Sequence, residues 1–164
     1  MAIVFPDWFE GGFPDRELLL CDLLQKFLDL CTPAGLACTW LPDNYREMVD
    51  GGTPVVRVYR GGPGADGQWD AAAMQVAVIA ATRADSWALM EYLRQILLSF
   101  DCGGKVRRAD GEINTITSIK EMVGPQQIPE LNPDFRMVPA TFRVECRRDR
   151  HLPDYAAIRE SIPL

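Results

Sequence analysis

Side chains that could carry nucleophilic or acid–base chemistry are few in this chain. It has one histidine, His151, and the nearest cysteine, Cys146, precedes it by five residues. A cysteine–histidine pair can form a nucleophilic thiolate, but catalysis also needs a group that orients the histidine and a turn that exposes the cysteine. The sequence shows neither feature. We therefore predict that the protein is not an enzyme and has no catalytic residue.

The cysteines and glycines also argue against a bound metal or cofactor. The five cysteines are widely spaced, form no CxxC pair and are expected to be reduced, mostly buried thiols: Cys21, Cys31, Cys38, Cys102 and Cys146. One histidine and scattered cysteines do not match the spacing of zinc ligands. The glycine-rich residues 61–64 lack the Gly-Lys-Ser/Thr ending of a phosphate-binding loop. We predict no metal and no cofactor.

Two pairs of carboxylates fall in segments that we expect to be loops, namely Asp66 with Asp70 and Glu130 with Asp134. General acid–base catalysis needs neighbouring groups whose environments separate their pKa values. Nothing in the sequence separates them here. We interpret all four as residues of turns and of the solvated surface.

Length and charge narrow the class of protein further. At 164 residues, 48% hydrophobic and 24% charged, the chain can form one domain with its own core. A net charge of −6 argues against broad affinity for nucleic acid. No segment approaches the roughly 20 apolar residues that span a bilayer, and residues 1–6 lack the basic start of a signal peptide, so we expect no membrane association. Four arginines near the C-terminus could end a solvated strand or face a partner: Arg143, Arg147, Arg148 and Arg150.

Hydrophobic periodicity predicts a soluble α+β domain with two main helices, one over residues 14–31 and one from an N-cap at Asp85 to a stop at Gly103-Gly104. Strands are predicted at residues 36–41, 55–60, 74–82 and 135–147, where Pro139 favours an edge position or a break. Residues 113–122 are ambiguous, and their β-branched content favours a strand with a bulge. We divide the chain into an aromatic arm (1–13), a core (14–148) and a tail (149–164) that forms a short helix or a coil. The arm is expected to dock on its own domain or on a neighbouring subunit.

The second predicted helix is apolar around most of its circumference. Its predicted core stripe recurs at helical spacing: Leu89, Leu93, Ile96 and Phe100. Further apolar side chains lie outside that stripe: Trp87, Met90, Leu97 and Leu98. A helix of this kind is expected to be buried on more than one side, so we predict that these four residues contact another subunit.

Two connections, residues 60–69 and 124–134, are longer than a chain reversal requires. The first joins two strands and is expected to project as a hairpin. Trp69 at its return could anchor a partner or cover the sheet edge, and the sequence leaves both open. The residues that we predict to contact partners from these connections are Asp66, Trp69, Gln126, Gln127 and Ile128.

Three phrases resemble the tail terminator (tail-completion) proteins of long-tailed bacteriophages, in particular the siphovirus lineage that infects actinobacteria. They are TPVVRVYRGG at residues 53–62, VAVIAATRADSWALME at 76–91, and VGPQQIPE at 123–130 leading to RMVPATFRVECR at 136–147. The resemblance implies an α+β fold in which a single mixed or antiparallel sheet is packed by two main helices, with long projecting loops. It transfers no catalytic or binding residue.

The resemblance also implies a structural role in the virion. Such proteins form a homohexameric ring at the head-proximal end of the tail tube, stop its polymerisation, and offer the surface on which the head–tail connector docks. The implied partners are further copies of the chain, the tail-tube protein and the connector or stopper. We expect DNA to pass the acidic lumen without specific binding. The location is the virion tail, and the host cytoplasm during assembly.

Other functions remain open at this point. A head–tail stopper or a tail-tube subunit of the same virion is the nearest alternative, although tube subunits carry paired sheets and a long hairpin in place of two substantial helices. A small enzyme or ligand-binding module would need a convergent pocket of titratable groups. A chaperone-like assembly factor would be absent from purified particles.

Overall fold

The computed structural model describes residues 3–62, 69–126, 134–147 and 152–162. Its helices are α1 (Arg16–Leu28), α2 (Tyr45–Asp50), α3 (Arg83–Leu98) and α4 (Tyr155–Ser161). Its strands are β1 (Leu36–Cys38), β2 (Val55–Gly61), β3 (Trp69–Ile79), β4 (Gly104–Arg107), β5 (Ile113–Val123) and β6 (Val138–Arg147).

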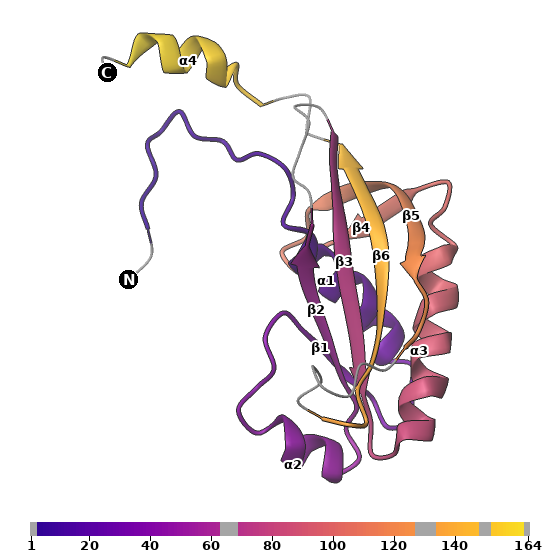
Figure 1. Cartoon of the computed structure of the whole chain (residues 1–164). Coiled ribbons are helices and arrows are strands. Elements are labelled where there is room, and N and C mark those ends of the chain that lie inside the picture. The colour runs from indigo at the N-terminus through magenta and orange to yellow at the C-terminus, as the bar shows by residue number, and fades with distance from the viewer. Residues whose placement is uncertain (1–2, 63–68, 127–133, 148–151, 163–164) are drawn as a thin grey trace.

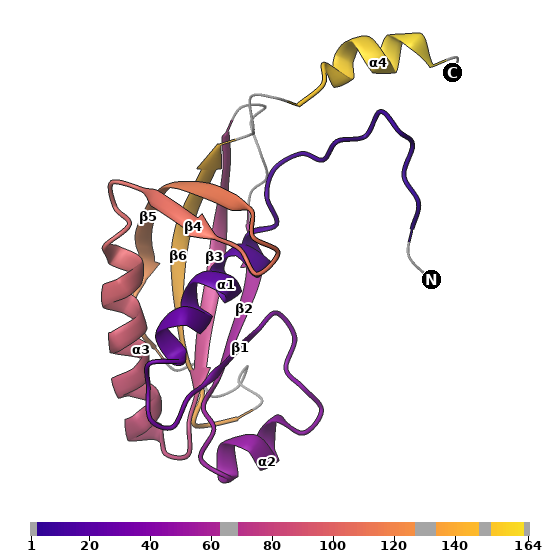
Figure 2. The same ribbon diagram turned by 180° about the vertical axis from the view of Figure 1, so that it is seen from behind.

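The strands form one mixed sheet in the order β1-β2-β3-β6-β5-β4. The pairing of β1 with β2 is parallel, and every other pairing is antiparallel. Helices α1 and α3 both lie on one face of this sheet (Figures 1 and 2). The α+β class with a single mixed sheet packed by two main helices is therefore confirmed.

The main core lies between the two long helices and the sheet. Alternate residues of the central strands point toward the helices, as the period of two along a strand requires: Ala72, Met74, Val76, Val78, Val138, Ala140, Phe142 and Val144. They meet the leucines of α1 and the buried side chains of α3. This apolar layer fixes which face of the sheet is covered.

Helix α1 begins at Arg16 and ends at Leu28, within the predicted range of residues 14–31. The Asp15 carboxylate accepts a hydrogen bond from the Leu18 amide at 3.1 Å, which is an N-cap. Gln25 then ties the helix to β1, because its side chain donates to the Gly35 carbonyl at 3.0 Å and accepts from the Ala37 amide at 2.8 Å. Two side-chain bonds therefore hold the short edge strand against the helix.

Helix α3 begins three residues earlier than predicted. Its N-cap is Thr82, whose hydroxyl accepts from the Asp85 amide at 3.1 Å and donates to the Asp85 carboxylate at 2.6 Å. Asp85 is thus the third helical residue of a reciprocal capping arrangement. The helix ends at Leu98 with Ser99 as its C-cap, ahead of the predicted stop at Gly103-Gly104. Gly103 belongs to the turn that follows, where its φ is +79° and a Cβ would lie 2.6 Å from the Thr117 carbonyl oxygen.

The expectation that Pro139 marks an edge strand or a break in the strand is wrong. Strand β6 is central, between β3 and β5, and neither breaks nor lies at the edge. Strand β5 pairs with β6 only as far as Thr141, so Pro139 lies beyond the end of that neighbour. The Pro139 carbonyl accepts from the Gln126 amide at 3.0 Å, which directs the polar groups of this residue away from β3. Proline therefore removes no hydrogen bond from the ladder with β3.

Two elements were not predicted, the helix α2 and the strand β4. Helix α2 has six residues and one buried side chain, Val49, so it leaves no readable periodicity. Val49 packs with Val55, Ile79 and Met137 in a second, smaller core on the face opposite α1 and α3. The prediction of a bulged strand at residues 113–122 is confirmed, because the register of β5 against β6 shifts twice.

Within the residues that the structure describes, none of the helices is long and apolar enough to cross a membrane.

Candidate assembly surfaces

The residues singled out for possible catalysis have structural roles where the structure describes them. Cys146 is buried in the main core, and burial raises the pKa of its thiol. His151 lies outside the described residues. In the described ranges, no group of three His, Cys, Asp or Glu side chains is placed to hold a metal ion.

The interpretation of the first carboxylate pair as solvated turn residues is wrong for Asp70. It is a residue of β3, 2% exposed, and forms an ion pair with buried Arg16 of α1. Its other oxygen accepts from Arg60 at 2.9 Å, while the Arg60 amide donates to Glu17 of α1 at 2.6 Å. These bonds clamp the base of the β2–β3 hairpin to the start of α1. Asp66, the other member of the pair, lies outside the described residues.

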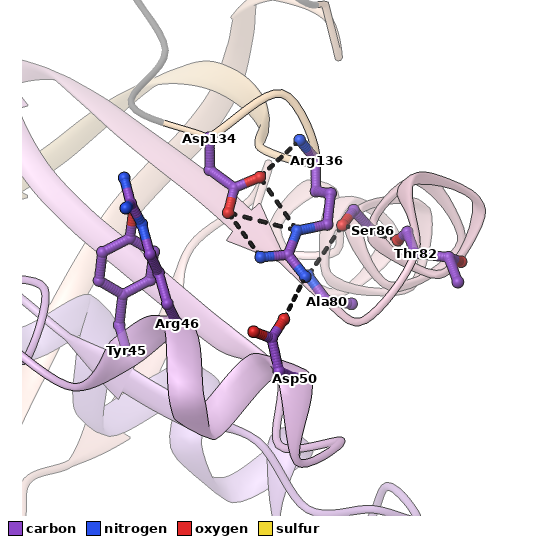
Figure 3. Close-up of polar contacts among 8 residues, drawn as sticks. All are labelled: Tyr45, Arg46, Asp50, Ala80, Thr82, Ser86, Asp134 and Arg136. Atoms are coloured by element: carbon purple, nitrogen blue, oxygen red, sulfur yellow. Dashed lines mark hydrogen bonds and ion pairs between the residues drawn. The ribbon is translucent and has the colours of Figure 1, made fainter.

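The interpretation of the second carboxylate pair as solvated turn residues is wrong for Asp134, which also forms an ion pair. Its carboxylate accepts from the Arg136 guanidinium at 2.8 Å, and Arg136 also donates to Asp50 of α2 at 2.7 Å (Figure 3). The hydrogen bonds from Arg136 hold the pKa of Asp134 below its usual value. Residues on either side of 127–133 are thus fixed, one by Arg136 and the other by the bond from the Gln126 amide to Pro139.

The four residues of α3 that we predict to contact another subunit differ in burial. Met90 and Leu97 are fully buried against the sheet, together with Leu93. Trp87 is 38% exposed and Leu98 is half-buried. The predicted core stripe is correspondingly shifted, since Leu89, Ile96 and Phe100 are only partly buried. In the structure, Met90, Leu93 and Leu97 of α3 fill the centre of the core. The apolar arc of this helix is wider than one face, so the sequence does not determine which of its residues point to the core.

The outer side of α3 carries an ion network beside its apolar residues. Arg94 donates to Glu121 of β5 at 3.0 Å through its terminal nitrogen, and to Glu91 at 3.0 Å. Tyr92 is 39% exposed, and its hydroxyl donates to the Phe27 carbonyl at 3.4 Å. These bonds therefore tie α3 to β5 on one flank and to α1 on the other.

The face of the sheet opposite α1 and α3 is polar away from α2. The Arg57 guanidinium lies between two rings, 5.5 Å from the centroid of Trp40 and 4.7 Å from that of Tyr59. Further along this face Lys120 pairs across the strands with Arg143, whose charge is met by Glu145 at 2.9 Å. Sequence reasoning missed this stack, although alternation along β2 places Arg57 and Tyr59 on one face.

The N-terminal arm and the C-terminal helix form an extension beside the sheet. Trp8 and Phe9 contact the Tyr155 ring of α4, with centroids 6.2 and 6.1 Å away. The Tyr155 hydroxyl accepts from the Glu10 amide at 3.1 Å and donates to the Gly11 carbonyl at 2.7 Å. Both segments project from the body at the same end (Figures 1 and 2). The arm therefore docks on the tail of its own chain, and the tail forms a short helix.

The remaining predicted contact residues lie at the hairpin and at the second long connection. Trp69 begins β3, where its backbone pairs with Arg147. Gln126 is exposed at the base of the second connection. Gln127 and Ile128 lie outside the described residues. The structure thus places Trp69 at the same end as the extension, and Gln126 beside Pro139 of β6.

The surfaces described above do not by themselves identify a protein family, so we compared the chain with known proteins. The comparison with curated protein sequences finds no match. A family model described as phage tail termination protein matches residues 12–153, which contain the whole sheet and helices α1, α2 and α3. The match covers most of the chain and agrees with the α+β fold. The chain therefore belongs to the family of phage tail termination proteins.

Proposed function

We propose that the protein caps the completed tail tube of a long-tailed phage as a homohexameric ring. In this role it stops tube polymerisation and forms the surface on which the head–tail connector docks. The observation that carries the proposal is the family match over residues 12–153. Family membership makes the chain a structural component of a phage tail; the ring, the head-proximal position and the siphovirus type belong to the proposal.

Ring formation requires two different surfaces on each subunit, because neighbours in a closed ring meet head to tail. The exposed outer side of α3, with Trp87 and Leu98, is one candidate for a contact between subunits. Asp66, Trp69, Gln126, Gln127 and Ile128 remain candidates for contacts with neighbours or with the tube. Met90 and Leu97 are excluded from this set because they are fully buried within the subunit.

The charge supports a channel that DNA passes without being held. The chain has a net charge of −6, and acidic side chains repel phosphate. Lysine in place of acidic residues that line the lumen should slow DNA ejection, measured on reconstituted phage. Ejection at the normal rate would refute the lumen argument without affecting the capping proposal.

The test of the proposed function is tube growth in vitro. Purified tail-tube protein is polymerised with and without this chain, and tube lengths are measured by electron microscopy. We expect growth to stop and labelled chain to sit at one end of each tube. Label along the whole tube would identify a tube subunit. Tubes of unchanged length that carry the chain only after connector is added would identify a stopper.

A further inference from the structure

The extension, formed by residues 3–11 and α4, leaves much apolar surface exposed within one copy of the chain. Its arm exposes a run of apolar side chains: Ile3 at 77%, Val4 at 92%, Phe5 at 57%, Trp8 at 43% and Phe9 at 42%. All seven residues of α4, each of them described, are exposed or half-buried. A helix of this length is marginal in water without packing against other elements. An exposed cluster of this kind marks an interaction surface.

Between the arm and α4 lies an open hollow of about 430 Å³. Among the described residues its lining is apolar and aromatic except for one charged residue, Arg159: Trp8, Phe9, Tyr155, Ile158, Arg159 and Ile162. The Arg159 side chain is 71% exposed and pairs with the neighbouring Glu160 at 3.6 Å. The chemistry of the hollow therefore matches an apolar surface that carries a negative charge.

A groove on the same chain has that chemistry. It has a volume of about 600 Å³ and lies between the end of α1 and the first half of α3. Its apolar lining includes Leu30, Pro33, Ala88 and Tyr92, and Asp85 is the one charged residue that the described part of the chain contributes to it. Leu30, 76% exposed, stands at the groove and is a side chain that the hollow could receive.

The extension and the groove lie at opposite ends of the subunit. The extension adjoins the start of β3, where Trp69 pairs with Arg147, and the groove adjoins its end, at Ala80. The 11 residues of β3 span about 36 Å at the usual rise per residue. One copy therefore does not fill its own groove in this arrangement, but its extension can reach the groove of the next copy.

We propose that the extension of one copy docks on the groove between α1 and α3 of a second copy, with Arg159 facing Asp85. The contact joins unlike surfaces, so it repeats head to tail. It rests on the proposed ring, to which it assigns the contact between neighbours. Residues 3–11 and α4 lie outside the matched residues 12–153, whereas the groove lies within them.

The test uses two variants that each lose one surface. V4E/F5E places charges on the exposed arm and leaves the groove intact, and A88E blocks the groove at an exposed helical position and leaves the arm intact. M122E is the matched control, because Met122 is 55% exposed on β5 and belongs to neither surface. Circular dichroism establishes that each variant is folded, and native mass spectrometry gives the assembly state.

We expect the wild type and M122E to form oligomers and the two surface variants to be monomers. Mixing V4E/F5E with A88E should give a one-to-one pair of twice 18.4 kDa, because one intact extension meets one intact groove. A wild type that stays monomeric, a surface variant that assembles like the wild type, or a mixture without pairs would each overturn the inference.

A charge exchange gives a second test that does not depend on the apolar variants. R159E and D85K should each weaken association about tenfold, and the chain that carries both should recover it, since each contact again joins opposite charges. No recovery in a folded double variant contradicts the contact. Tube growth separates the two proposals: a chain that assembles through another surface yet stops tubes refutes only this contact. A chain that pairs as expected but leaves tube length unchanged refutes only the capping function.

Discussion

At the scale of single residues, buried and half-buried charges tie distant segments together. Asp70 joins the hairpin to α1 through Arg16 and Arg60, and Arg136 joins the segment after residue 133 to α2 through Asp50. A buried charge that loses its partner is costly because it keeps its desolvation penalty. These residues are therefore where a single substitution is expected to cost most.

Asp70→Asn is expected to lower the free energy of unfolding by about 3 kcal/mol, since it leaves the buried Arg16 guanidinium without a counter-charge. Urea denaturation followed by circular dichroism measures the change. Asp101→Asn, at an exposed position, is the control and should change stability by less than about 0.5 kcal/mol. Equal stability of the two variants would show that the Asp70 pair contributes nothing.

The ion pair between Asp134 and Arg136 should make the stability of the fold depend on pH. Arg136 lowers the pKa of Asp134 below its usual 3.8, so the ionised form is favoured in the folded chain. The resulting stabilisation is complete above the unfolded pKa and is lost as pH falls through the lower folded value. We expect Asp134→Asn to cost about 1–2 kcal/mol at pH 7. Thermal unfolding from pH 7 to pH 2 should show this difference vanish only in the acid range. A constant difference across that range would contradict the ion pair.

At the scale of elements, α3 separates a folding face from an exposed face. Met90, Leu93 and Leu97 pack into the core, while Trp87 and Tyr92 are exposed. The same helix therefore serves stability and, on the proposed function, assembly. Substitutions on its two faces should have different effects.

Leu97→Ala should destabilise the folded monomer by about 3 kcal/mol, because it leaves a cavity in the core. Trp87→Asp should leave the melting temperature within a few degrees of the wild type and weaken self-association. Melting curves and native mass spectrometry of both variants distinguish the two faces. A Trp87→Asp chain that assembles and completes tails normally would remove this side of α3 from the proposed interface.

At the scale of the whole molecule, the family core and the extension are separable. Residues 3–10 are exposed, and the family match begins at residue 12. The projecting arm and α4 meet each other in preference to the main core (Figure 1). Stability and assembly should therefore respond differently when the arm is removed.

Removal of residues 2–11 should change the free energy of unfolding by less than about 1 kcal/mol, because no described arm residue belongs to either core. The truncated chain should be monomeric, in contrast to the full chain, if the extension supplies the contact between copies. Urea denaturation and native mass spectrometry of the truncated and full chains test both statements. A large loss of stability would place the arm in the folding unit itself.

The sequence by itself determined the features that depend on local periodicity and short-range chemistry. The two long helices and the alternating strands follow from the spacing of apolar residues along the chain. The phrases at residues 53–62, 76–91, 123–130 and 136–147 also indicated the family that the comparison identifies.

Only the tertiary structure decided the features that depend on which segments meet. Asp70 and Arg16 are 54 residues apart, and nothing local marks them as partners. The central position of β6 and the rotation of α3 depend on the neighbours of each element, which a broad apolar arc does not specify. The meeting of the arm with α4 likewise joins the two ends of the chain, and long-range contacts of this kind are fixed by the packing of the whole molecule.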